Sequence, residues 1–250
     1  MFTIHVDTVY DLRLAVLPLA TLCDEADIKC SREKLSIIVV SSPYPFVASL
    51  RMLPTFFTTF QLHPDGDNFE EHRYKFLLQL FATNISNMYS EDLSMTIYIG
   101  GNQRLAPLKF EDPHTGYLQY SALVLSHAQN IDISPIDFGV FVAIRSTEFI
   151  NIVSDLVILP DELVSITLTE TEVKFGALTG EVTFTTENKD CIIGGVKGGK
   201  VFYFIITLHP VYFFFHISYT SKFVWIFKTV SSRNLLSCCT GLHASYLVCY

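Results

Sequence analysis

The sequence predicts an α+β protein that contains two copies of one structural unit, and two observations lead to this prediction. The order of strand, helix, turn and further strands occurs over residues 2–50 and again over residues 138–188. In each copy, apolar residues alternate where strands are expected and recur every three or four positions where the helix is expected. A chain of 250 residues is long enough for two domains that each bury a core.

The first copy opens with an alternating segment at residues 2–6, which predicts a strand. A helix is expected next, because the following apolar residues fall at spacings of three and four: Val9, Leu12, Val16, Leu19 and Cys23. Pro18 lies inside this helix, where proline costs ~3 kcal/mol unless a kink absorbs the strain. A turn at residues 24–27 then leads into further strands.

The second copy has the same order. A strand is expected at residues 140–144, and Ser146 is the expected N-cap of a helix. The apolar face of this helix consists of Phe149, Ile152, Val153 and Leu156. Strands are expected after residues 160–161, because Val164, Ile166 and Leu168 alternate with polar residues, and again around residues 173–175 and 182–185.

Residues 138–156, with Val173-Lys-Phe175 and Gly180-Glu181 after them, resemble the start of the second domain of the proliferating cell nuclear antigen family, the eukaryotic DNA sliding clamps. The first copy agrees with this resemblance in the order of its segments, which are 26–31, 35–37, 46–50, 69–74 and 92–95. The resemblance implies the DNA-clamp fold. It places a first domain at residues 1–120, an interdomain connector at 121–135 and a partial second domain at 136–190.

Two regions do not fit the repeat. Residues 75–89 lie between two family-like segments and are expected to be an insertion at a strand connection, where added length costs little free energy. Residues 191–250 form an unassigned aromatic-rich tail that has no Asp, Glu, Lys or Arg between Lys200 and Lys222. Since nothing in this tail aligns with the end of a clamp domain, the second domain is expected to be truncated.

Three interpretations of the tail remain open. Residues 201–221 are long enough for a transmembrane helix, although His209-Pro210 and many aromatic and β-branched residues disfavour a helix there. The tail could instead supply buried strands to the second domain, but neither period-two alternation nor turn signals are visible. The interpretation that we favour at this point is a segment that specifies no evolved structure.

The resemblance implies a DNA polymerase processivity factor in the nucleus: a homotrimeric ring that encircles duplex DNA and performs no chemistry of its own. In that family, helices line the hole and present Lys and Arg to phosphates. This role falls on Arg13 in the first helix, and on Arg104 and Lys109 in a helix expected after residues 92–95. Several other basic positions of the family are lost, at Leu14, Ala20, Asn151 and Ser154. Ordinary solvated helix faces are the other interpretation of the three basic residues.

The family also binds DNA polymerase and other clients through short peptides, in an apolar pocket beside the interdomain connector. The resemblance assigns this partner site to the following residues: Tyr44, Leu123, Leu125, Ile131, Ile133 and Pro135. In the other interpretation, the apolar residues pack the connector onto the sheet.

Composition limits the remaining functions. A net charge of −8 argues against a protein coated with Lys and Arg for nucleic-acid binding, but allows basic residues on one inner face. Residues 194–200 have the glycine and lysine spacing of a phosphate-binding loop, but Val201 stands where Ser or Thr would bind magnesium. Cys238, Cys239 and His243 lack a second pair of metal ligands. We therefore expect no enzyme, no cofactor and no metal.

Two alternatives to the processivity factor stay open. The chain could be a degenerate clamp-like interaction protein that does not form a ring and associates with an intact clamp. It could also be anchored to a membrane through residues 201–221, which the composition of that segment disfavours.

Overall fold

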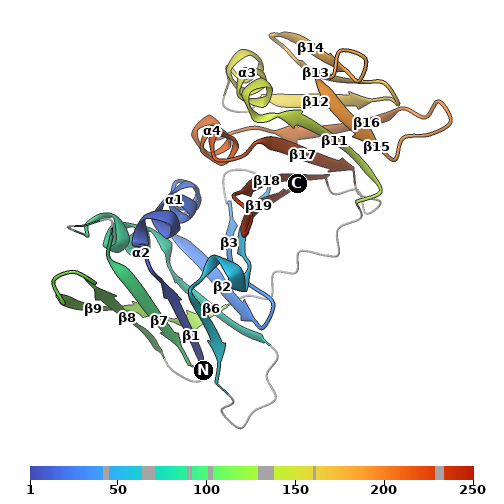
Figure 1. Cartoon of the computed structure of the whole chain (residues 1–250). Helices are drawn as coiled ribbons and strands as arrows, with labels where there is room; N and C mark the ends of the chain where they lie inside the picture. Colours follow the sequence, from blue (N-terminus) through green and yellow to red (C-terminus); the bar gives the residue numbers. More distant parts are fainter. Residues whose placement is uncertain are drawn as a thin grey trace. The chain divides into compact units, whose positions relative to one another are not determined.

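The structure is a computed structural model. It describes residues 1–41, 45–63, 71–88, 90, 92–100, 104–128, 138–159, 162–228 and 234–250. The chain divides into two compact units, of which the first comprises residues 1–40 and 49–131 and the second comprises residues 41–48 and 132–250. Both units combine antiparallel strands with helices, so the predicted α+β class is confirmed (Figure 1).

The N-terminal half of the chain contains two α-helices, one short 3-10 helix and a series of antiparallel strands. Its elements are β1 (Phe2–Val6), α1 (Val9–Ala20), β2 (Glu25–Ser31), β3 (Leu35–Val40), β4 (Val47–Met52), η1 (Pro54–Phe56), β5 (Thr59–Leu62), β6 (Glu71–Leu77), α2 (Leu78–Ser86), β7 (Ser94–Ile99), β8 (Leu105–Glu111), β9 (Leu118–Val124) and β10 (Ser126–His127).

The C-terminal half repeats this order. Its elements are β11 (Val140–Arg145), α3 (Ser146–Leu156), β12 (Leu163–Leu168), β13 (Glu172–Ala177), β14 (Gly180–Thr185), β15 (Cys191–Gly194), β16 (Phe202–Thr207), α4 (Val211–Tyr219), β17 (Phe223–Lys228), β18 (Asn234–Thr240) and β19 (Ala244–Cys249).

The two units match strand for strand. The first contains the sheet orders β5-β1-β7-β8-β9 and β6-β2-β3-β4, with β10 beside β6, and the second contains β15-β11-β17-β18-β19 and β16-β12-β13-β14. Each strand label in the second unit is therefore the label of its counterpart plus ten. The central strands also pair alike, since β1 is antiparallel to β5 and β7, and β11 is antiparallel to β15 and β17. The predicted repeat thus extends over the whole of both units.

Each unit has a layer of two helices. In the first unit α1 packs against α2, and in the second α3 packs against α4 (Figure 1). The predicted apolar stripes point into the two cores, since Val9, Leu12, Val16 and Leu19 are buried, as are Phe149, Ile152, Val153 and Leu156. Cys23 lies beyond the end of α1 and is only half-buried. The expected cap at Ser146 is wrong, because α3 begins at this residue and the N-cap is Arg145, without a side-chain hydrogen bond.

The segment expected to be an insertion is an element of the repeat. Residues 75–77 end β6, and α2 follows at once with four buried side chains, which are Leu78, Phe81, Ala82 and Ile85. The expectation is therefore corrected. The repeat is hard to see in the sequence because α2 and its counterpart α4 have different amino acids. They share only their place in the strand order and a buried apolar face.

The expectation of a truncated second domain with an unassigned tail is also corrected. Residues 191–250 supply β15 and β17, which pair with β11, and β16, which pairs with β12. They also supply α4, β18 and β19. Of the three interpretations of the tail, the structure agrees with buried strands of the second unit. Within the part of the chain that the structure describes, no helix has the length and apolar character needed to cross a membrane.

Glu162 is a buried carboxylate that holds two loops of the second unit together. One of its oxygens accepts hydrogen bonds from the amides of Ile158 and Leu159, at 3.0 and 3.2 Å, and the other accepts one from the amide of Leu178, at 3.1 Å. Burial alone would raise the pKa of Glu162, but these backbone hydrogen bonds outweigh it and lower the pKa below its ordinary value. The charged form is therefore the one that stabilises the fold.

We expect Glu162→Gln to lower the melting temperature of the second unit at neutral pH. Because the folded-state pKa is lowered, this stabilisation is present above the pKa of an unfolded glutamate, roughly 4.3, and is lost as pH falls through the folded-state value. The difference in melting temperature between the wild type and the variant should therefore shrink below about pH 4. Thermal unfolding followed by circular dichroism measures this. The exposed Glu187→Gln is the control, and an equal effect of both variants would contradict the assignment.

Candidate functional site

The exposed helix surfaces are the first candidate site, because the clamp resemblance assigns them to DNA. Among all residues of α1, α2, α3 and α4, the basic side chains other than histidine are limited to Arg13. The same helices carry three carboxylates, Asp11, Glu148 and Asp155. Exposed positions are instead occupied by large uncharged side chains, which are Tyr10, Leu14, Leu80, Tyr212 and Tyr219. The helix surfaces therefore offer little positive charge to phosphates.

Arg13 is half-buried on α1, and its guanidinium carbon lies 5.3 Å from the centre of the Tyr10 ring. This distance is within the range of a cation–π contact, which holds the guanidinium against the helix. The side chain nevertheless keeps its charge at the helix surface. Of the three residues predicted to contact DNA, Arg13 is therefore the one that the structure places on a helix.

Arg104 and Lys109 are not on a helix. The segment after residues 92–95 forms β7 and β8, with Arg104 exposed just before β8 and Lys109 within it. The expected helix is therefore wrong. The alternating apolar residues Ala106, Leu108 and Phe110 give the physical reason, because all three are buried on one face of a strand.

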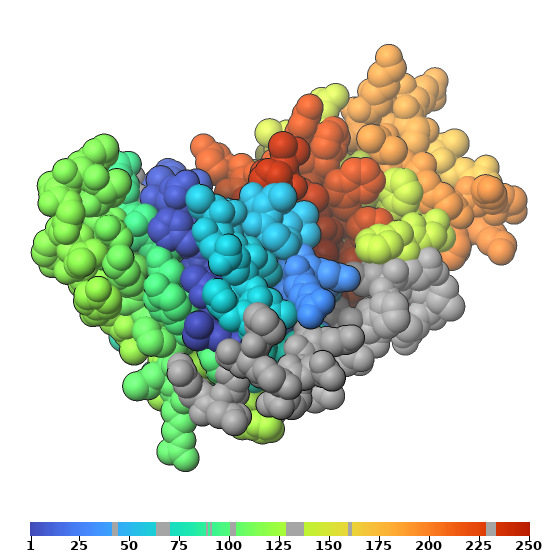
Figure 2. Space-filling model, turned by 60° about the horizontal axis from the view of Figure 1, so that its bottom comes forward, coloured from blue at the N-terminus to red at the C-terminus, as the bar shows by residue number. Residues whose placement is uncertain are grey.

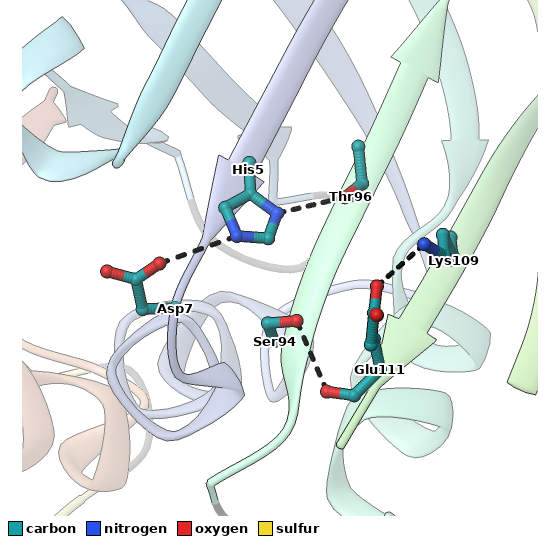
Figure 3. A network of polar contacts seen from close by, with 6 residues as sticks. All are labelled: His5, Asp7, Ser94, Thr96, Lys109 and Glu111. Atoms are coloured by element: carbon teal, nitrogen blue, oxygen red, sulfur yellow. Dashed lines mark hydrogen bonds and ion pairs between the residues drawn. The ribbon is translucent and has the colours of Figure 1, made fainter. Parts of the chain in front are cut away.

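Lys109 belongs to a polar network on the sheet of β1, β7 and β8 (Figure 3). Its ammonium lies 2.6 Å from the carboxylate of Glu111, and this hydrogen bond raises the pKa of Lys109. On the neighbouring strands, His5 Nδ1 is 2.9 Å from Thr96 Oγ1, and His5 Nε2 is 3.4 Å from Asp7 Oδ1. Sequence reasoning missed this network because its members come from three strands, and only the strand register brings them together.

This network places a hydroxyl, an imidazole and a carboxylate in the order that nucleophilic catalysis uses. It lies on an open sheet surface, whereas the cavity found in the described part of the first unit, about 10 Å³, is inside the core and lined by apolar side chains. A space of that size holds about one water molecule. The arrangement therefore gives no substrate pocket, and we assign the network to cross-strand stabilisation of the sheet.

A second group of basic side chains lies on the β2-β6 sheet. Lys29 Nζ is 2.6 Å from Glu71 Oε2, and Arg73 pairs with the same carboxylate. Burial lowers the pKa of Lys34, and the nearby cations of Arg51 and Lys29 lower it further. In this sheet Ile28 and Phe76 point into the core beneath the helices, so alternation turns Lys29 and Arg73 to the opposite face. The largest basic group of the first unit therefore lies away from its helices.

The structure describes only part of the predicted partner site. Tyr44, Ile131, Ile133 and Pro135 lie outside the described residues. Leu123 and Leu125 are 3 % and 5 % exposed, and Leu123 lines the core cavity of the first unit. Leu123, in β9, and Leu125, just after it, are therefore packed into the core and offer no surface to a partner in this conformation.

Several strands end their sheets, and among them are β9 in the first unit and β14 in the second. In the β8-β9 ladder the amides of Leu125 and Asp112 donate to the carbonyls of Arg104 and Tyr117, at 2.8 and 2.9 Å. Hydrogen-bonded pairs alternate along an antiparallel ladder. The backbone groups that face away from β8 are therefore those of Leu118, Tyr120, Ala122 and Val124. Figure 2 shows the β8-β9 segment, in green, at the margin of the first unit.

The same reasoning applies to β14. The amide of Thr186 donates to the carbonyl of Thr171 at 2.9 Å, which sets the alternation of the β13-β14 ladder. The backbone groups of Glu181, Thr183 and Thr185 consequently point away from β13, and of these the carbonyl of Thr185 accepts a hydrogen bond from the amide of Asp190 at 3.2 Å. Unpaired amides and carbonyls in a row are a template for pairing with another strand. Among the strand edges that the structure describes, β9 and β14 thus supply one such edge in each unit.

The described residues contain no convergence of three side chains that could hold a metal ion. The six cysteines are free thiols, and burial raises the pKa of Cys191 to about 11, which keeps it protonated. The glycine-rich segment 194–200 follows β15 and leads into β16, so it does not open a helix as a phosphate-binding loop would. None of these features supplies a catalytic site.

No family model matches this chain, and a search of curated proteins found no match. The features that bear on function are therefore the fold, the helix surfaces and the open edges of β9 and β14.

Proposed function

We propose that this chain is a subunit of a DNA sliding clamp, a ring in the nucleus that encircles duplex DNA and tethers DNA polymerase and other replication proteins. The observation that carries the proposal is the complete strand-for-strand repeat, in which each unit has two sheets and a layer of two helices. A ring built from such units can place its helices toward DNA and its sheets outward. It needs no cofactor and no catalytic site, since topology provides the retention on DNA.

The open edges of β9 and β14 support assembly into a homotrimer. If β9 of one copy pairs with β14 of the next, each copy uses two different surfaces, and such head-to-tail contacts generate a ring when the rotation closes. Main-chain hydrogen bonds would provide the affinity. The exposed side chains along β9 add apolar surface beside this edge, and they include Leu118, Tyr120 and Val124.

A threading experiment tests this function. The protein is incubated with a linear duplex that has one end blocked by streptavidin, the second end is then blocked, and the complex is washed in high salt. We expect a fraction of the protein to resist the wash, and to be released when a restriction enzyme cuts the duplex. Loss of all protein in the wash, with both ends blocked, would contradict the proposal.

The charge of the helix surfaces favours a second candidate, a clamp-like interaction protein that does not grip DNA. Arg13 is the lone lysine or arginine of the four helices, against three carboxylates. This candidate would bind an intact clamp or its clients and would fail the threading experiment. Co-sedimentation with an intact clamp identifies it.

The same charge count predicts how binding depends on salt. The slope of log K against log salt concentration is about −0.9 for each phosphate neutralised, so one arginine for each subunit predicts a slope of about −1 for each subunit. Filter binding at several salt concentrations measures it, and Arg13→Ala should flatten it while Arg32→Ala, outside the helices, should not. A slope of about −5 or steeper for each subunit would show that other cations contact DNA.

A further inference from the structure

Because the units repeat strand for strand, the sheet that contains β1 can be compared position by position with the sheet that contains β11. The faces compared are those that point away from the core of each unit. In the first unit the row across β1, β7 and β8 is His5, Thr96 and Lys109. The equivalent row across β11, β17 and β18 is Ala143, Trp225 and Ser237. In the next row, Thr3 and Tyr98 correspond to Phe141 and Phe227. A surface that is polar in one unit is therefore apolar and aromatic in the other.

This aromatic face consists of Phe138, Phe141, Ile192, Trp225 and Phe227. Its rings form one connected group, in which Phe138 meets Phe227 edge-on at 4.9 Å and Phe141 lies 5.4 Å from Trp225. Trp225 and Phe227 are nearly parallel, with ring centres 6.3 Å apart. Phe227 forms a small buried apolar cluster with Leu235 and Leu247, and Phe141 and Trp225 pack against this cluster.

The aromatic face is supported from below, and its members other than Phe227, which is buried, keep exposed surface above. The ring of Phe141 lies against Gly194, where an added Cβ would come within 2.4 Å of it, so glycine is required for this ring position. Phe138 is 57 % exposed and Ile192 is 50 % exposed, while Phe141 and Trp225 are half-buried. Rings that are fixed in place and partly exposed have the character of binding hot spots, since little entropy is lost when a partner covers them.

Two cations lie at one end of this face. Arg145 ends β11 directly opposite Phe223, and Lys222 precedes Phe223, with its carbonyl accepting a hydrogen bond from the amide of Ser146. Both side chains are exposed, and within the described chain neither forms an ion pair. The half-buried Asp190 precedes Cys191, which lies opposite Ile144 in the β11-β15 ladder. Its negative charge partly offsets the two positive charges. The local balance is positive in a chain whose net charge is −8.

We propose that the aromatic face is a docking surface for a partner-protein segment that combines apolar or aromatic anchors with acidic residues. The anchors would cover Phe138, Phe141 and Trp225, and the carboxylates would meet Arg145 and Lys222. An anionic membrane is the less suitable occupant, because a chain of net charge −8 is repelled by it as a whole. The inference uses the second unit alone and does not depend on the clamp proposal.

Trp225 is the single tryptophan of the chain, so its fluorescence reports on this face without labelling. The full-length protein is titrated with a synthetic tryptophan-free peptide in which a leucine-phenylalanine pair follows a run of glutamates. We expect a saturable blue shift or quenching of the emission. Peptides with serines in place of the apolar pair, or lysines in place of the glutamates, should bind about tenfold more weakly or not at all.

Three variants locate the site. Phe138→Ala removes an exposed ring, and Phe141→Thr introduces the residue type that the first unit has at the equivalent position, so both should fold. Each should weaken peptide binding about tenfold, as should Arg145→Glu. Tyr203→Ala is the control, because Tyr203 is an exposed aromatic residue on β16, in the other sheet of the unit.

Four outcomes would overturn the proposal. These are an unchanged Trp225 emission with the acidic peptide, equal binding of the serine peptide, an emission shift with phosphatidylserine vesicles but not with the peptide, and an emission that changes with protein concentration alone. The third would identify a membrane surface and the fourth a second copy of the chain.

Discussion

Replacing Phe213 with alanine is expected to lower the free energy of unfolding of the second unit by about 3–5 kcal/mol. Phe213 is on α4 and is fully buried. Its ring stacks on Phe46 at 6.1 Å and meets Phe214 edge-on at 5.1 Å. Because rings surround it, the space left by alanine cannot be filled by small shifts, and both the transfer energy and the packing energy are lost.

Tyr212→Ala is the matched control, because Tyr212 precedes Phe213 on the same helix but is 70 % exposed. Its effect should stay within about 0.5 kcal/mol. Chemical denaturation of both variants, followed by circular dichroism, makes the comparison. If the two variants were equally stable, residues 191–250 would not form the core that the structure describes, and the segment would again be an unfolded tail.

The sequence predicted the repeat correctly where side chains alternate between apolar and polar. The stripes of α1 and α3 and the alternation of β12 each have one face toward a core and one toward solvent or polar groups. A half-buried element has a periodic signal. For this reason the α+β class and the start of both units could be read from residues 2–50 and 138–188 alone.

The strands of residues 191–250 were missed because they are apolar on both faces. In β16, Phe204 and Ile206 are buried while Tyr203 and Ile205 are exposed, and in β17, Val224 and Ile226 are buried beneath Phe223, Trp225 and Phe227. Burial therefore alternates, but hydrophobicity does not, so no period is visible. In α4 the aromatic residues disfavour a helix intrinsically, and packing against α3 overrides that preference.

The candidate site was less predictable than the fold. Lys109 was assigned to a helix because the family has a helix near that position, yet the alternation of Ala106, Leu108 and Phe110 was itself a strand signal. The aromatic face and the open edges depend on which strands are neighbours. That information comes from the register of residues far apart in the chain, which a local pattern does not contain.

Replacing Ala122 with proline is expected to abolish assembly while leaving the first unit folded. Ala122 lies opposite Pro107 in the β8-β9 ladder, at a pair whose backbone groups on β9 point to the open edge. Proline therefore removes a donor from the edge without removing one from the ladder, and proline is tolerated at such edge positions. The unfolding free energy should change by less than about 1 kcal/mol. Ala122→Val keeps the donor and is the control.

Sedimentation velocity and the threading experiment measure the effect. We expect wild type and Ala122→Val to assemble and to resist the high-salt wash, and Ala122→Pro to do neither. Thr183→Pro, on the open edge of β14, should behave in the same way, because its amide also points away from the neighbouring strand. If Ala122→Pro assembled like the wild type, pairing through β9 would be excluded.

A mixture of the two proline variants separates a head-to-tail ring from other assemblies. Ala122→Pro retains an intact β14 edge, and Thr183→Pro retains an intact β9 edge, so one copy of each can form a single contact. Neither has a second edge with which to continue. The mixture should therefore give a dimer that does not close and is not retained on end-blocked DNA. In a symmetric contact, β9 would pair with β9 of another copy, and β14 with β14. Each variant alone would then form homodimers, through the one edge that it keeps intact.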